Sequence, residues 1–127
     1  MEWYNGLFLS EGLQGKKDKL IEKIEKRAGT PRVYLITLAA NKRDYFDIFS
    51  SNLMFQPVLH GHCPMIVGLA GSWYQAVDIS ADIALKSYET FGRFDIEAYL
   101  KSLLDDGEAY SFRYPSERLK KKKRLFF

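Results

Sequence analysis

The residues best suited to chemistry lie together in one short segment, His60-Gly61-His62-Cys63-Pro64. Two imidazoles and a thiol are ligand types that zinc accepts. Structural zinc sites draw ligand pairs from separate segments, whereas this segment holds all the histidine and cysteine of the chain. A closed site would need a carboxylate from elsewhere or the same loop of another subunit. His60, His62 and Cys63 are therefore weak metal candidates, and we favour a turn before a buried strand, with no metal and no cofactor.

No pattern of side chains indicates a catalytic residue. Cys63 and a neighbouring histidine lie too close in sequence to aim at one point as nucleophile and base. Asp78 and Asp82 stand four residues apart on an expected helix, and paired carboxylates can perform acid–base chemistry in a cleft. Lys86 follows Asp82 by four residues, however, so an ion pair on a solvated face explains them better. We expect a protein that is not an enzyme.

A strand that runs through a glycine turn into a helix forms the second candidate site, Gly68-Leu69-Ala70-Gly71-Ser72. The N–H groups and positive dipole end of such a helix attract anions, including nucleotide phosphates. The contacts would come from Gly68, Gly71 and Ser72, and Trp73 would stack on a ring. The segment lacks the third glycine of the dinucleotide fingerprint and the Gly-Lys-Ser/Thr of a P-loop. Glycines that only permit a tight turn and close helix packing are the competing interpretation.

The C-terminal segment is the strongest anomaly of composition. Its cations would attract phosphates of a nucleic acid, and they are Arg118, Lys120, Lys121, Lys122, Lys123 and Arg124. The chain has 19 basic and 16 acidic residues; residues 115–127 hold six and one of these, which leaves 13 and 15 for the rest. We therefore expect no basic face on the body. The apolar end, 125–127, could instead bind an anionic membrane surface or a groove of a partner protein. The alternative to any binding role is a terminus that is solvated or folded back on the domain.

Two apolar runs predict strands that are covered on both faces. In residues 33–40 and 65–70, side chains pointing either way are largely apolar. Between them we expect a helix of about two turns, with Asn41 as N-cap and Asp44 at position N3. These elements predict a β–α–β unit, right-handed if the strands are parallel neighbours. Residues 53–59 could add a short strand, and the proline in this segment would confine that strand to an edge of the sheet.

Helices are expected on either side of this unit. Residues 16–28 predict a charged helix with a narrow apolar stripe, and residues 3–15 a short strand or an irregular lid. Ser72 and Gln75 form a capping box that opens a long helix, and Gly92 ends it. That helix carries one apolar stripe: Ala76, Val77, Ala81, Ala84, Tyr88 and Phe91, widened by Trp73, Ile83 and Leu85.

A last helix is expected from Asp95 to Gly107. Its inward side chains would be Ile96, Leu100, Leu103 and Leu104. We predict one α/β domain over residues 1–107, with one β–α–β unit, a short sheet of two to four strands and flanking helices, followed by a basic tail over 108–127. Because two strong strands make too small a sheet, either the weaker segments or a second subunit must extend it. The 15% content of aromatic residues favours a homodimer.

Three short motifs resemble those of a family of short bacterial cytosolic proteins to which no activity is assigned. The family is similar in carrying a YxITLAxN strand, found here at 34–41, a VGLA strand at 67–70 and an FD[IV]xxYL helix at 94–100, with a glutamine near Gln56. The likeness covers roughly residues 3–100 and omits the tail. It implies a bacterial cytosolic setting and no catalytic residue.

The remaining expectations concern function and location. A single cysteine cannot form an internal disulfide, which favours the reducing cytoplasm, and neither a signal peptide nor a transmembrane segment is expected. The leading function is a non-catalytic protein-interaction or regulatory module. The alternatives are a nucleic-acid-associated accessory protein that acts through the tail, and a small anion- or nucleotide-binding protein that uses the Gly68–Ser72 turn.

Overall fold

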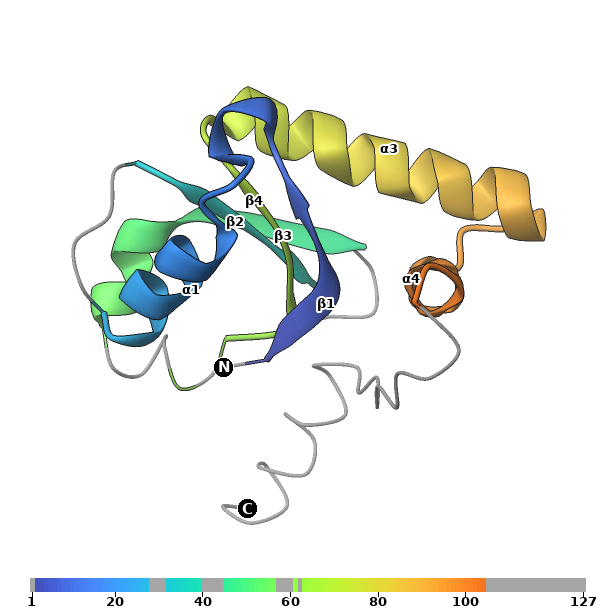
Figure 1. Ribbon diagram of the computed structural model, residues 1–127. Coiled ribbons are helices and arrows are strands. Elements are labelled where there is room, and N and C mark those ends of the chain that lie inside the picture. Colours follow the sequence, from blue (N-terminus) through green and yellow to red (C-terminus); the bar gives the residue numbers. More distant parts are fainter. Residues whose placement is uncertain (1, 28–31, 40–44, 57–60, 62, 105–127) are drawn as a thin grey trace, which may run out of the picture.

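The protein is built on one four-stranded sheet with helices on both faces (Figure 1). The computed structural model describes residues 2–27, 32–39, 45–56, 61 and 63–104. The strands are β1 (Trp3–Leu9), β2 (Tyr34–Leu38), β3 (Phe46–Ser50) and β4 (Ile66–Ala70), in the order β1-β4-β2-β3. β1 and β4 are parallel, and the other neighbours are antiparallel. The mixed α/β class and the short sheet are as predicted.

The two central strands are buried on both faces, as their sequence predicts. Leu35 of β2 and Leu69 of β4 are paired neighbours that pack into one apolar cluster. Ile36 and Val67 pack into a second cluster on the other face. All four side chains have no exposed surface. Strands covered by helices on both sides lose the alternation of polar and apolar residues, which is why these runs read as continuously apolar.

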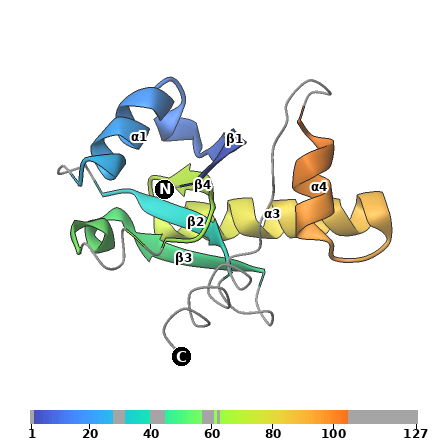
Figure 2. The same ribbon diagram turned by 90° about the horizontal axis from the view of Figure 1, so that it is seen from below.

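Each face of the sheet has its own layer of helices (Figures 1 and 2). Buried residues of α3 (Trp73–Phe91) and α4 (Ile96–Ser102) cover one face. The other face is covered by α1 (Lys17–Glu25) and the 3-10 helix η2 (Ser51–Phe55). A second 3-10 helix, η1 (Glu11–Leu13), links β1 to α1. The sheet is therefore the middle layer of three.

The helix ends follow the predicted capping pattern. The Ser72 hydroxyl accepts a hydrogen bond from the Gln75 amide at 3.2 Å, and α3 ends at Gly92, whose φ of 71° is left-handed. The Asp95 carboxylate accepts a hydrogen bond from the Ala98 amide at 3.1 Å and begins α4. These bonds satisfy N–H groups that lack partners within a helix.

The helix predicted between the two apolar strands is wrong, because residues 46–50 form β3. This strand pairs antiparallel with β2, with Leu38 opposite Phe46 and Tyr34 opposite Ser50. The predicted caps, Asn41 and Asp44, lie outside the described residues. β2 and β4 are also antiparallel, so the β–α–β unit proposed over 33–70 does not form. Aromatic and β-branched residues fill a half-buried strand as readily as one helix face, and five residues are too few to separate the two periods.

Two further expectations also need correction. Residues 53–55, expected in an edge strand, belong to η2, which the Ser50 hydroxyl caps by accepting a hydrogen bond from the Asn52 amide at 3.3 Å. Residues 57–59 of that expected strand lie outside the described residues. In the last helix, Leu103 was expected inward but is exposed, because α4 ends at Ser102 before the turn that would bury it.

The N-terminal segment completes the sheet. β1 runs parallel to β4, with Trp3 beside Ile66 and Phe8 beside Gly68, so five steps along β1 match two steps along β4. This irregular bulge lets a loosely patterned segment join the sheet at its edge. Because β1 and β3 supply the missing strands, a second subunit is not needed to complete the sheet.

Candidate interaction surface

The predicted anion site has its main polar groups engaged within the chain. The Gly71 N–H donates to the Ser10 hydroxyl at 3.0 Å, and the Ser72 hydroxyl caps α3. Gly68 lies where β1 and β2 approach β4, and a Cβ built there would meet Ile36 Cδ1 at 3.1 Å. These contacts favour the structural role of a tight turn. Ligand binding at this turn stays a prediction.

Trp73 is half exposed at the first turn of α3, beside the turn with which it was predicted to act. Its ring makes an edge-to-face contact with Tyr74, with centroids 5.7 Å apart. Tyr74 is 78% exposed. The pair forms an exposed aromatic projection at the N-terminal end of α3.

The predicted metal candidates are only partly described. His60 and His62 lie outside the described residues. Cys63 is buried in the apolar cluster under α1, and it forms no disulfide. Within the part of the chain that the structure describes, no group of three His, Cys, Asp or Glu residues is placed to hold a metal ion.

The tail candidates lie outside the described residues as well. They are Arg118, Lys120, Lys121, Lys122, Lys123 and Arg124, and the polyanion contact proposed for them stays a prediction.

An exposed apolar surface runs along α3 on the side away from the sheet. The apolar stripe predicted for this helix divides into two faces: Ala76 and Ile83 are buried in the core, whereas Ala81, Leu85 and Tyr88 are exposed. The helix therefore has more apolar surface than one sheet face can cover. We call the outer set the α3 stripe, and it consists of the half-buried Val77 and the exposed Tyr74, Ala81, Leu85 and Tyr88.

The spacing of the α3 stripe is that of a helix-packing seam. Tyr74, Ala81 and Tyr88 are seven residues apart, and Val77 and Leu85 fall between them at steps of three and four. Such a row lies on one side of a helix and packs against another helix when the apolar repeat is about 3.5 residues. Soluble proteins leave single apolar residues exposed, but a continuous row of them marks a contact surface.

Three aromatic rings in tilted contact continue this surface beyond the end of α3. The Phe94 ring lies 5.0 Å from that of Tyr88 and 5.5 Å from that of Tyr45, measured between centroids. All three residues are about half exposed. Tyr45 precedes β3 and Phe94 follows α3, so the fold brings together rings that are far apart in sequence. We call these three residues the ring cluster.

The polar border of the stripe is largely acidic. Asp78, Asp82 and Glu89 are exposed on α3, and Lys86 Nζ lies 3.0 Å from an Asp82 carboxylate oxygen. The hydrogen bond to Asp82, followed by the charge of that carboxylate, raises the pKa of Lys86. An apolar centre with a charged rim is the anatomy of a protein–protein contact.

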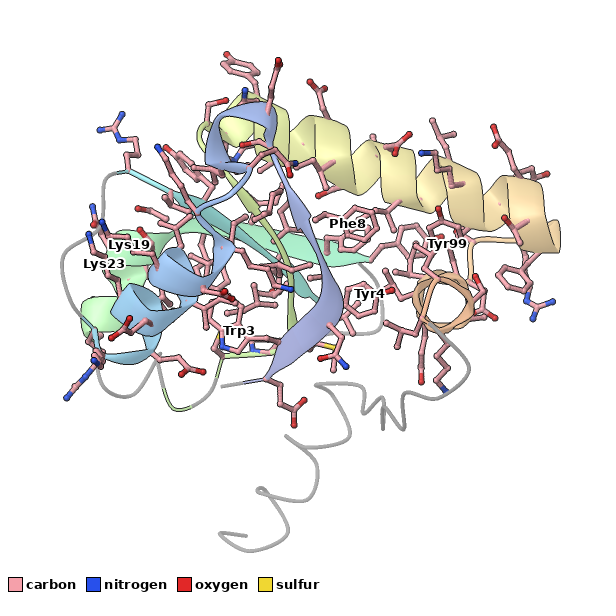
Figure 3. The ribbon with its side chains drawn as sticks, in the orientation of Figure 1. Trp3, Tyr4, Phe8, Lys19, Lys23 and Tyr99 are labelled. Atoms are coloured by element: carbon pink, nitrogen blue, oxygen red, sulfur yellow. The ribbon has the colours of Figure 1, made fainter. Side chains whose placement is uncertain are left out.

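A second charged feature lies on α1, on the opposite face of the sheet. Lys16, Lys19 and Lys23 form a row at steps of three and four, next to an acidic row of Asp18, Glu22 and Glu25. Figure 3 shows Lys19 and Lys23 together on the outer side of α1. The lysine row is a local grouping of cations flanked by carboxylates of the same helix, and the expectation that the body has no basic face stays a prediction.

Sequence reasoning missed the ring cluster and the outer role of the stripe. For the stripe, the available signal was the width of the apolar arc on α3, which is larger than packing against one sheet face requires. The ring cluster has no local signal, because Tyr45 lies more than forty positions in sequence from the other two rings.

The comparisons with known proteins add no relative. No family model matches the chain, and no curated protein or solved structure matches it. The resemblance stated above therefore stays a prediction.

Among the residues that the structure describes, no helix combines the length and the apolar composition that crossing a membrane requires.

Proposed function

We propose that this chain is a non-catalytic protein-interaction module that works as a homodimer in the bacterial cytoplasm, with the α3 stripe and the ring cluster as its contact surface. The single observation that carries the proposal is the apolar row from Tyr74 to Tyr88, in which every residue except the half-buried Val77 is exposed. Such a row costs free energy in water, and association removes it from water. A regulatory role would act through this same contact.

The tyrosines make the surface suitable for specific recognition. Tyr74, Tyr88 and Tyr45 each present a ring and a hydroxyl group. Tyrosine supplies a large apolar contact at low cost in side-chain entropy, and its hydroxyl keeps the surface compatible with water before binding. Tyrosine and tryptophan are enriched among the residues that dominate binding energy.

The test is the state of association of the full chain, measured by sedimentation equilibrium. We expect a concentration-dependent dimer, and we expect the double variant Leu85→Ser, Tyr88→Ser to weaken it by roughly tenfold or more, because two central contacts are truncated. The matched control, Asp18→Asn with Lys19→Gln, alters two exposed polar residues of α1 on the opposite face of the sheet and should leave association intact. A wild-type chain that is monomeric at about 1 mM overturns the proposal.

A nucleic-acid-associated role is the second candidate, and the lysine row on α1 favours it. Lys16, Lys19 and Lys23 would contact successive phosphates, in addition to the basic tail of the sequence. Binding of a single-stranded oligonucleotide should then weaken steeply with salt, and Lys19→Glu with Lys23→Glu should flatten that slope. Binding that is unchanged by this variant and by removal of residues 115–127 excludes the role.

A further inference from the structure

The α3 stripe has the same order of residue types in both directions. From Ala81 outward, each side presents first an aliphatic residue, Val77 or Leu85, and then a tyrosine, Tyr74 or Tyr88. The aliphatic residues lie four positions from Ala81, and the tyrosines lie seven positions from it. The stripe is therefore a palindrome centred on Ala81.

A palindromic row is complementary to a second copy of itself. In a two-fold symmetric interface, residue i of one copy contacts residue j of the other, and j contacts i. When two copies of α3 lie antiparallel about Ala81, Tyr74 faces Tyr88 and Val77 faces Leu85, twice each. We propose that the partner of this surface is a second copy of the chain, and that the two-fold axis crosses α3 at Ala81. This inference rests on the proposed function and adds the geometry.

The smallest side chain stands where the two helices come closest. Ala81 is exposed, so the approach of a second helix is not blocked by a larger neighbour at this point. Packed helix axes lie about 8–10 Å apart, and the shorter distances need small residues at the contact. Larger side chains on either side then fill the space where the helices diverge.

The antiparallel arrangement also joins the aromatic ends. The N-terminal end of α3 carries the Trp73–Tyr74 ring pair, and the C-terminal end leads to the ring cluster. In an antiparallel dimer, each ring pair lies beside the partner's ring cluster. A parallel dimer would instead set like ends and like helix dipoles together.

The exposed area is sufficient for a specific dimer. The stripe residues of two copies would remove on the order of 1,000 Å² from solvent, the lower bound for a stable specific interface, and the ring cluster adds to it. Lys86 pairs with Asp82 within each copy, which lowers the acidic charge of the border, and salt screens the exposed carboxylates of Asp78 and Glu89. A second copy therefore meets the requirements of area and shape.

Disulfide trapping in the full chain tests this geometry. The wild type is the background, because its one cysteine, Cys63, is buried. With helix axes about 8–10 Å apart, Cα atoms on the contact line lie about 3.5–5.5 Å apart, which overlaps the range of a disulfide. In a glutathione redox buffer, we expect Ala81→Cys to form a covalent dimer.

Three further cysteine variants determine whether the two helices are antiparallel or parallel, and they exclude cross-linking by random collision. Glu89→Cys is the collision control, because its two copies would lie roughly 24 Å apart along the helix axis. Ala81→Cys should cross-link at least about tenfold more, given the high effective concentration of thiols within a dimer. Val77→Cys and Leu85→Cys should cross-link with each other when mixed, and much less with themselves.

The outcomes separate this inference from the proposed function. A dimer in sedimentation that does not cross-link through Ala81→Cys overturns the inference and leaves the interaction module standing. Self-linking of Val77→Cys at the level of the mixture shows a parallel dimer and also overturns it. If the chain is monomeric and the thiol of Ala81→Cys resists a thiol reagent, another segment of the same chain covers the stripe, and the proposed dimer is wrong. A monomer in which that thiol reacts freely overturns both proposals.

Discussion

The hydroxyl group of Tyr4 in β1 donates a hydrogen bond to the main-chain carbonyl oxygen of Leu100 in α4, across 96 residues of sequence. Both residues are buried in the apolar cluster under α3, and Tyr4 also stacks on Phe8. Figure 3 shows Tyr4 and Phe8 on the side of β1 that faces Tyr99 of α4. This bond connects the first strand to the last described helix.

Loss of this hydrogen bond should destabilise the fold. We expect Tyr4→Phe to lower the free energy of unfolding by about 1–3 kcal/mol, because a buried carbonyl loses its partner while the ring stays in place. Urea denaturation at low protein concentration measures the change. Tyr45→Phe is the matched control: it removes a hydroxyl from a half-exposed ring and should change stability little. Equal stability of the two variants would show that water replaces the lost donor.

The hydroxyl group of Thr37 should be dispensable. In the described part of the chain its oxygen is buried without a hydrogen-bond partner, on the central strand β2. Thr37→Val keeps the shape and removes the polar atom, so we expect it to stabilise the protein by up to about 1–2 kcal/mol. Thr37→Ser keeps the hydroxyl and should instead cost about 1 kcal/mol, from the lost methyl group. Thermal unfolding of the two variants compares them, and a less stable Thr37→Val protein would contradict the prediction.

Gly68 should be required for packing. An added Cβ would lie 3.1 Å from Ile36 Cδ1 and 3.2 Å from the Phe8 carbonyl oxygen, and the carbonyl cannot move without disturbing β1. We expect Gly68→Ala to cost about 1–3 kcal/mol of unfolding free energy. Gly12→Ala, where nothing lies within 4 Å, should be neutral or slightly stabilising. If Gly68→Ala is as stable as Gly12→Ala, the close approach of β1 is not a constraint.

The Glu22–Lys26 pair on α1 should have a defined pH range. The hydrogen bond between them (2.6 Å), followed by their charges, lowers the pKa of Glu22 from 4.5 and raises the pKa of Lys26 from 10.5. The stabilisation is therefore complete between these two ordinary values. It is lost as pH falls through the lowered pKa of Glu22 or rises through the raised pKa of Lys26.

An NMR titration of the Glu22 carboxyl group tests this directly. In the wild type the midpoint should lie below 4.5, and in Lys26→Gln it should return towards 4.5. Lys86→Gln removes the cation of a different helix and should leave the Glu22 midpoint unchanged. A wild-type midpoint at or above 4.5 would mean that water screens the exposed pair completely.

Local signals determined much of the fold. The capping groups at Ser72 and Asp95 and the left-handed Gly92 are short-range features, because a cap involves a side chain and an amide within three residues. The burial of Ile36 and Val67 also followed from sequence, since a strand apolar on both faces has few other environments. These features can be predicted without knowing which elements pack against them.

The tertiary structure decided what local patterns left open. Phe46 and Phe49 suit a helix face or a half-buried strand, and only pairing with β2 selects the strand. The apolar arc of α3 was evident in the sequence, but only the position of the sheet decides that Ile83 lies inside and Leu85 outside. The ring cluster depends on the contact of Tyr45 with Phe94, a residue more than forty positions away, which no local pattern contains. Sequence periodicity records how apolar a surface is, whereas packing decides which part of that surface the fold leaves exposed.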